Sequence, residues 1–168
     1  MPLIKDGAFA EDAFVTVADD AALPTNGAIV SLARFRKERE ALLARNAPLG
    51  VVLKPAESPE VLGEDVHRLS VIVFEFPVFR DGRAFSWARM LRERMKFDGE
   101  IRGAGHFLYD QIEFMKRTGF TAWDVPEGFT LELFNRALGE ISNVYQPSAD
   151  GKKTIGELRG GIAEARET

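Results

Sequence analysis

The feature that most constrains the fold is an apolar run from Leu69 to Phe76, which Pro77 ends. It is the most hydrophobic stretch of the chain, is rich in β-branched residues, and has the length of a strand rather than of a helix. A strand that is apolar on both faces is typical of the interior of a parallel sheet. We therefore predict that residues 69–76 form the central buried strand.

Segments typical of strands and of helices alternate along the chain from residue 28 onwards. Strands are predicted at residues 28–30, 50–53, 69–76, 100–105 and 120–123, with a further edge strand at 143–145. Helices are predicted from apolar residues at helical spacing, at 32–45, 82–97, 106–118 and 131–141. Such alternation indicates parallel pairing through crossovers. We expect an α/β domain with a mainly parallel sheet of four to five strands and flanking helices, either flavodoxin-like or like part of a βα-barrel.

The two ends of the chain differ in character from this alternating part. Asp6-Gly7 is a turn signal and residues 13–17 are β-prone, so the first 25 residues read as a hairpin or an irregular lead-in. The polar, Gly-rich segment 147–168 is expected to be a partly disordered tail. A single domain is thus predicted over residues 1–146.

Composition excludes several classes of function. The 168 residues contain no cysteine, which excludes disulfides, thiolate nucleophiles and cysteine-held iron–sulfur clusters. His67 and His106 are the only histidines, too few for a histidine-rich metal centre, and we expect no bound metal and no cofactor. The net charge of −4 argues against nucleic acid as a partner. No signal peptide or apolar run long enough for a membrane span is present, so the expected location is cytoplasmic.

Positive charge is nevertheless concentrated between residues 80 and 102, which hold seven basic and four acidic residues. Within it, Asp81-Gly82-Arg83 stands at the predicted start of a helix and just after the central strand. Helix N-termini attract anions, and ligands gather beyond the carboxyl ends of parallel strands. The candidate residues for binding an anion or a partner protein are Asp81, Arg83, Ser86, Arg89 and Arg102. We call this set the arginine-rich rim.

Each candidate also has a purely structural interpretation. In that interpretation, Asp81 serves only as the helix cap and the partner of an arginine, and Ser86 is an ordinary surface serine. Arg102 falls in a predicted interior strand, where a guanidinium needs partners. It either pairs with an acid such as Glu100, Glu75 or Asp81, or contacts a ligand in a polar pocket; if its strand lies at a sheet edge, it is solvated.

Chemistry other than anion binding is only weakly indicated. Gly103-Ala104-Gly105 has two of the three glycines of a dinucleotide-binding turn, and close helix-on-strand packing explains them equally well. His106, at the predicted start of a helix, and Asp110, one turn later, are candidate proton-transfer groups. The alternative is that His106 is a partly exposed capping residue.

Two long motifs and one short motif resemble a known family. They are residues 79–92 (FRDGRAFSWARMLR), 99–111 (GEIRGAGHFLYDQ) and 117–120 (RTGF). Together they resemble the bacterial domain-of-unknown-function family nine-three-four over about residues 3–146. Gly103 stands where that family usually has alanine, which removes no functional group.

The resemblance implies a role in assimilatory sulfite reduction, because members of the family are described as oxidoreductases or accessory proteins associated with it. Since the chain has no cysteine and no complete nucleotide motif, an accessory protein is the leading hypothesis. Its expected partner is sulfite reductase or the electron donor of that enzyme, or else a small oxyanion held by the arginine-rich rim. The alternative is an enzyme, such as an oxidoreductase, that acts on a small anionic substrate through His106 and Asp110. Association of two copies of the chain into a homodimer is a further open alternative.

Overall fold

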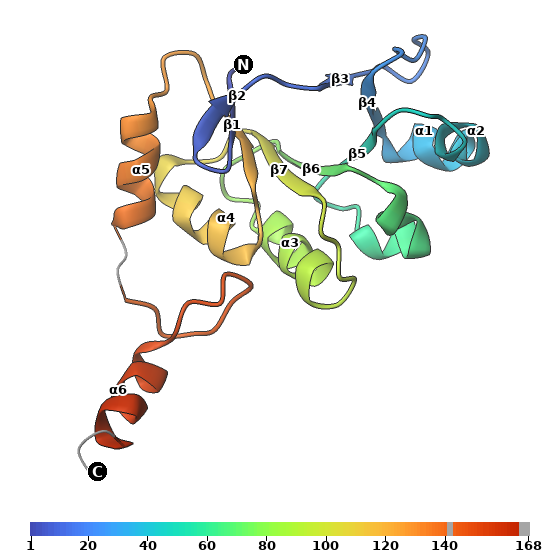
Figure 1. Cartoon of the computed structure of the whole chain (residues 1–168). Helices are drawn as coiled ribbons and strands as arrows, with labels where there is room; N and C mark the ends of the chain where they lie inside the picture. The colour runs from blue at the N-terminus through green and yellow to red at the C-terminus, as the bar shows by residue number, and fades with distance from the viewer. Residues whose placement is uncertain (141–142, 165–168) are drawn as a thin grey trace.

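The computed structural model describes residues 1–140 and 143–164 as eight strands, six α-helices and two 3₁₀ segments (Figure 1). The strands are β1 (Leu3–Lys5), β2 (Ala8–Ala10), β3 (Phe14–Thr16), β4 (Gly27–Ser31), β5 (Leu49–Leu53), β6 (Val71–Phe76), β7 (Glu100–Gly105) and β8 (Ala122–Asp124). The helices are α1 (Leu32–Lys37), α2 (Arg39–Leu43), α3 (Arg83–Glu93), α4 (Ile112–Thr118), α5 (Leu131–Gly139) and α6 (Ile155–Glu164). The 3₁₀ segments are η1 (Pro59–Arg68) and η2 (Tyr109–Gln111).

All eight strands belong to one sheet, in the order β2-β1-β8-β7-β6-β5-β4-β3. The strands from β3 to β8 pair in parallel, whereas β1 pairs antiparallel with both β2 and β8. The predicted α/β class and mainly parallel sheet are therefore confirmed, and the prediction of four to five strands is wrong. The three additional strands all come from the first 16 residues, where the sequence predicted a hairpin or an irregular lead-in but not its membership of the main sheet.

The sheet is curled into a half-barrel. Strands β2 and β3 lie at opposite ends of the strand order, yet only residues 11–13 connect them. Four residues from Ala10 to Phe14 reach at most about 14 Å, whereas the seven spacings of a flat sheet would separate these strands by about 33 Å. The two ends of the sheet must therefore curl toward each other, and this favours the barrel-like alternative over the flavodoxin-like one.

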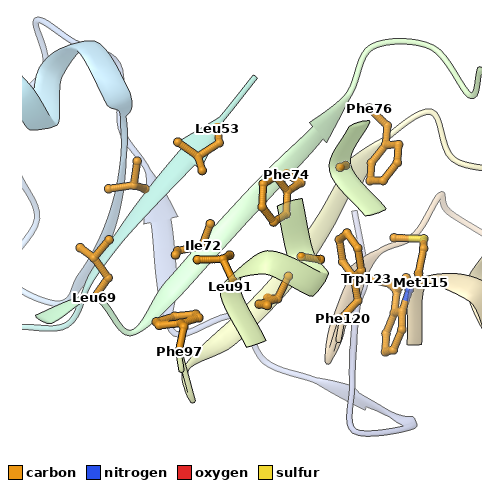
Figure 2. Packing of buried hydrophobic residues seen from close by; sticks show 14 of the residues in the cluster. Leu53, Leu69, Ile72, Phe74, Phe76, Leu91, Phe97, Met115, Phe120 and Trp123 are labelled. Atoms are coloured by element: carbon orange, nitrogen blue, oxygen red, sulfur yellow. The ribbon is translucent and has the colours of Figure 1, made fainter. Parts of the chain in front are cut away.

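Helices cover only one face of this sheet. Its side chains come from alternate strand positions such as Ile72, Phe74 and Phe76, and they pack against α3, α4 and the segment that leads into β8 (Figure 2). The opposite face, which we call the inner face, carries Ile29, Val71 and Val73. These three side chains are buried although no helix covers them, because Phe14 packs against them and the N-terminal segment crosses this face.

Several local predictions are confirmed. Asp6 and Gly7 both have positive φ, 50° and 85°, as a two-residue turn between β1 and β2 requires. Ser31 accepts a hydrogen bond from the N–H of Arg34 at the start of α1, and Thr130 accepts one from the N–H of Leu133 in α5. Both hydroxyls thus cap their helices.

Other local predictions are wrong. The helix expected at 32–45 is split into α1 and α2, and residues 143–145 form no strand. The helix expected from His106 begins only at Ile112, because Gly105 with φ 100° turns the chain first. The tail, for which no element was predicted, contains α6. Residues 141–142 of the predicted helix and edge region, and 165–168 of the tail, lie outside the described residues. Among those described, no helix is both long and apolar enough to cross a bilayer.

Candidate functional site

Helix α3 carries three of the five residues of the arginine-rich rim on its side that faces away from the sheet. Ala84, Ala88 and Leu91 are buried against the sheet, so the residues between them face away from it. Arg83, Ser86 and Arg89 are spaced three residues apart, which places them along one line of the helix surface. All three residues are exposed. We call these three residues the α3 stripe.

Both arginines of the α3 stripe have an acidic partner within the chain. Arg83 donates from Nε and Nη2 to the Asp81 carboxylate, at 2.9 and 2.7 Å, and Arg89 donates from Nε to Glu93 at 2.7 Å. The hydrogen bonds from Arg83 hold the pKa of Asp81 below its usual value. Exposed ion pairs of this kind contribute little to stability and are screened by salt. Both guanidinium groups therefore remain accessible to solvent while they are paired.

Asp81 does not cap the helix in the predicted way. The N-cap residue of α3 is Gly82, and Asp81 accepts a hydrogen bond of 3.3 Å from the N–H of Arg83, the first helical residue. The carboxylate thus lies at the helix N-terminus, where a negative charge is favoured. This places the anionic group of Asp81 at the position where the sequence predicted an external anion.

A groove of about 230 Å³ runs beside the α3 stripe, between α3 and α4. Ser86 and Arg89 line it on one side, and Phe114 and Arg117 line it on the other. Phe114 is 50% exposed, which is unusual for a phenylalanine on a helix that packs against a sheet. Arg117 pairs with Asp150 at 3.2 Å. The groove therefore offers basic and aromatic groups next to the α3 stripe.

Arg102 lies on the inner face, on the other side of the sheet from α3. It is in β7, paired with Val73 of β6 and Ala122 of β8, so the predicted interior strand is confirmed. Its guanidinium donates to Glu100 at 2.8 Å and to both carboxylate oxygens of Asp12 at 2.6 and 3.0 Å. The sequence suggested Glu100 as a partner but not Asp12, which only the crossing segment brings close.

Two more charged groups complete the cluster around Arg102. Asp124 lies 3.7 Å from Arg102 Nη1, and Lys5 pairs with Glu100 at 2.8 Å. Burial alone would lower the pKa of Arg102, but the hydrogen bonds and charges of Asp12 and Glu100 raise it overall. The arrangement matches the predicted internal lock. The structure thus brings Asp81, Arg83, Ser86 and Arg89 together and places Arg102 elsewhere.

The carboxylates around Arg102 differ in the sign of their pKa shift. Burial raises the pKa of Asp12, but hydrogen bonds from Arg102 and the Phe14 N–H outweigh burial, so the pKa lies below its usual value. Burial raises the pKa of Asp124, and the charges of Asp12 and Glu100 reinforce this against the attraction of Arg102.

Substitution of Asp12 is expected to destabilise the protein in a pH-dependent way. Because the folded-state pKa of Asp12 is depressed, its ionised form adds stability above the unfolded-state pKa of about 3.9, and this stability is lost as the pH falls through the folded-state value. Asp12→Asn should therefore lower the free energy of unfolding at pH 7 and have a smaller effect at pH ~2.5, where part of this contribution is already lost. Urea denaturation at the two pH values measures the difference.

Asp124→Asn is the matched contrast, because the folded-state pKa of Asp124 is raised. Its ionised form costs stability above that raised value, and the cost disappears below the unfolded-state pKa. The substitution should not lower, and is expected to raise, the free energy of unfolding at pH 7. A loss of stability at pH 7 equal to that of Asp12→Asn would contradict the assigned signs.

His106 and Asp110 do not share a helix. The prediction placed both on one helix face, but His106 lies in the loop after β7 and Asp110 in η2. His106 lines a different feature, an apolar hollow of about 800 Å³ beyond the carboxyl ends of β6, β7 and β8. We call it the carboxyl-edge hollow. Its lining consists of Met1, Pro77, Val78, Phe79, Arg80, Gly105, His106, Phe107, Leu108 and Pro126.

The hollow was missed in the sequence because its apolar residues look like core residues. Val78, Phe79 and Leu108 are exposed in the structure. The one available indication was the continuation of apolar residues past Pro77, beyond the end of the strand. Among the described side chains, those of residues 1–140 and 143–159, no group of three or more histidine, aspartate or glutamate residues is placed to hold a metal ion.

The two glycines before His106 serve packing. A Cβ on Gly103 would lie 2.3 Å from the terminal methyl of Met115, and a Cβ on Gly105 would lie 2.5 Å from the carbonyl oxygen of Phe76. Because Gly103 has no Cβ, Met115 of α4 can lie close to β7. Because Gly105 has no Cβ, the end of β7 can lie close to Phe76 of β6. This is the helix-and-strand packing explanation of the partial dinucleotide motif.

Comparison with known proteins gave one result about family. The profile of a family described as a bacterial protein of unknown function (DUF934) matches residues 50–155. No curated protein matches the chain. The match begins at β5 rather than near residue 3 and includes all three motifs, and its description names no activity, pathway or partner.

Proposed function

Since the chain belongs to the DUF934 family of bacterial proteins of unknown function, we propose that it is an accessory protein of assimilatory sulfite reduction that docks on an acidic partner protein through the α3 stripe. The place in sulfite reduction rests on the resemblance of the motifs at 79–92 and 99–111. The docking surface rests on geometry. Sulfite reductase or its electron donor is the partner to test first.

The observation that carries the proposal is the alignment of Arg83, Ser86 and Arg89 beside the groove between α3 and α4. Their ion pairs are exposed, so the arginines can accept partner carboxylates in place of Asp81 and Glu93. The exposed ring of Phe114 in the same groove supplies the apolar contact that a protein interface needs. A small inorganic anion would use the arginines but not this ring.

Charge favours association with an acidic partner in the same way. The chain as a whole carries a net charge of −4, whereas residues 80–98 present five exposed basic side chains against three acidic ones, Asp81, Glu93 and Asp98. A basic face attracts a negative surface, and the acidic remainder of the protein repels it, so the molecule is oriented as it approaches. Such orientation raises the association rate and makes it depend on salt.

Reversing the charge of the α3 stripe should weaken docking. The Arg83→Glu/Arg89→Glu variant is expected to bind purified sulfite reductase from the same bacterium at least ~10-fold more weakly at low salt, because two attractive contacts become repulsive. Binding of the wild-type protein should also weaken as sodium chloride screens these charges. Surface-immobilised wild-type and variant chains titrated with the enzyme give both measurements.

Arg39→Glu is the matched control. Arg39 is 53% exposed beside a 15% exposed Asp65, and Arg83 is 55% exposed beside a 15% exposed Asp81, but Arg39 lies on α2. The proposal requires that Arg39→Glu bind like the wild type. It is overturned if neither sulfite reductase nor its electron donor associates at low salt, or if both variants lose the same affinity. Thermal stabilisation by sulfite or sulfate, without protein association, would assign the arginines to a small oxyanion instead.

A further inference from the structure

The geometry points to a second site, the carboxyl-edge hollow, as a binding site for a small amphipathic anion. We propose a ligand with an apolar body and one carboxylate, sulfonate or phosphate group. This site is separate from the α3 stripe, so it goes beyond the proposed docking function and does not depend on it.

The position of the hollow is the one where parallel α/β sheets bind their ligands. Pro77 directly follows β6, Gly105 is the last residue of β7, and Pro126 lies two residues after β8, so three neighbouring strands point their carboxyl ends at the hollow. Ligands of such sheets collect at this edge because the connecting loops there are free to vary while the strands hold them in place.

The two main loops of the hollow are held in place by one side chain. The amide of Gln111 donates to the carbonyl oxygen of Phe79 at 2.9 Å and accepts from the N–H of Leu108 at 2.9 Å. The N–H of His106 donates to the carbonyl oxygen of Phe76 at 2.7 Å. These bonds fix the loops after β6 and β7 relative to each other, so the hollow is formed before any ligand arrives, which favours affinity.

The lining of the hollow specifies the class of ligand. Val78, Phe79 and Leu108 present exposed apolar surface to it. Of the described side chains that line the hollow, those of Arg80 and His106 are the only ones able to carry charge, and neither can be negative. Arg80 lies over the Phe79 ring, 5.3 Å from its centroid, and has no acidic partner among the side chains of residues 1–140 and 143–159. An apolar body with one negative group complements this surface.

The size of the hollow fits a small molecule. Its volume of about 800 Å³ falls within the range of ~300–1,000 Å³ that ligand pockets occupy. A single side chain of a partner protein would fill only a part of it. The fit therefore favours a ligand with an extended chain or two fused rings over a peptide anchor.

The dye 8-anilinonaphthalene-1-sulfonate, which has an apolar two-ring body and one sulfonate, is the probe. Titration of the full chain is expected to give a saturable fluorescence increase with one site per chain. Decanoate should displace the dye, and 1-decanol, which has the same length without the charge, should displace it less well. In Arg80→Gln, decanoate should displace the dye no better than 1-decanol does, and 1-decanol should bind as it does to the wild type.

A matched pair of variants locates the binding. Leu108 in the hollow and Leu133 on α5 are 43% and 41% exposed, so aspartate perturbs the two surfaces to a similar degree. Leu108→Asp is expected to weaken dye binding by at least ~10-fold, and Leu133→Asp and Arg83→Glu/Arg89→Glu are expected to change it less than ~2-fold. Circular dichroism melting verifies that each variant is folded.

The proposal is overturned by unsaturable dye binding, by equal loss in Leu108→Asp and Leu133→Asp, or by equal displacement with decanoate and 1-decanol. A concentration-dependent dimer that Leu108→Asp abolishes would assign the hollow to a second copy of the chain and would also overturn it. Since the docking experiment uses Arg83 and Arg89, either proposal can fail while the other stands.

Discussion

Replacing Arg102 with methionine is expected to lower the free energy of unfolding by about 3 kcal/mol. The guanidinium and the Glu100 carboxylate are only 3% and 5% exposed. Removal of Arg102 takes the bidentate partner from Asp12 and leaves the buried Glu100 with only the half-exposed Lys5 of its two cationic partners, and a buried charge that loses a partner is costly. Methionine keeps most of the volume of the arginine side chain. The loss of unfolding free energy therefore measures the removal of the charge rather than the creation of a cavity. Urea denaturation at neutral pH, monitored by tryptophan fluorescence, measures the effect.

A double variant separates the ion pair from packing. In Arg102→Met/Glu100→Gln the buried Glu100 carboxylate is replaced by a neutral amide. The double variant should therefore be more stable than Arg102→Met alone. Lys5, which also pairs with Glu100, is half exposed and can turn to solvent when Glu100 is replaced. If Arg102→Met alone were as stable as the wild type, the cluster would contribute no net stability and its role as a lock would be excluded.

Gly105→Ala is expected to cost about 3 kcal/mol of unfolding free energy, from backbone strain and steric conflict acting together. Its φ of 100° is unfavourable for any residue with a Cβ. The added Cβ would also lie 2.5 Å from the carbonyl oxygen of Phe76, a backbone atom of a central strand that cannot move away easily. The variant should unfold at lower urea concentration with an unchanged slope.

Gly128→Ala isolates the conformational part of this cost. Gly128 has φ 82°, but no atom lies within 4 Å of the position of an added Cβ. Its substitution should cost only the strain of a left-handed residue, about 1–2 kcal/mol. Equal losses in the two variants would show that the close approach of β6 and β7 at Gly105 contributes nothing.

The parts of the fold that could be predicted are those encoded locally. Of the strand predicted at 69–76, residues 71–76 form β6 near the centre of the sheet, and Ser31 and Thr130 cap their helices as expected. Strand periodicity and capping depend on a few neighbouring residues, so both can be read locally. The curvature of the sheet could not be predicted in this way. It depends on the pairing of β1 with β8, which are over 100 residues apart, and no local pattern records such a contact.

The same distinction applies to the candidate site. Arg83, Ser86 and Arg89 share a helix, so their spacing was enough to place them on one surface. Arg102 was correctly placed in an interior strand with Glu100, but its strongest contact, Asp12, is 90 residues away. The carboxyl-edge hollow was missed because exposed and buried phenylalanines are identical in a sequence, and only the three-dimensional arrangement of loops distinguishes Phe79 from Phe76.

The crossing of the inner face by residues 11–13 has a consequence for the order of folding. Strand β1 emerges first from the ribosome, yet its partner β8 is complete only when Asp124 has been synthesised. Strands β4 to β7 pair in chain order, each with the next strand to be synthesised. They can therefore assemble before β8, the partner of β1, has been made. The first strand to be made is thus among the last to be placed, and its arrival with Asp12 and Phe14 closes the inner face over a sheet that already exists.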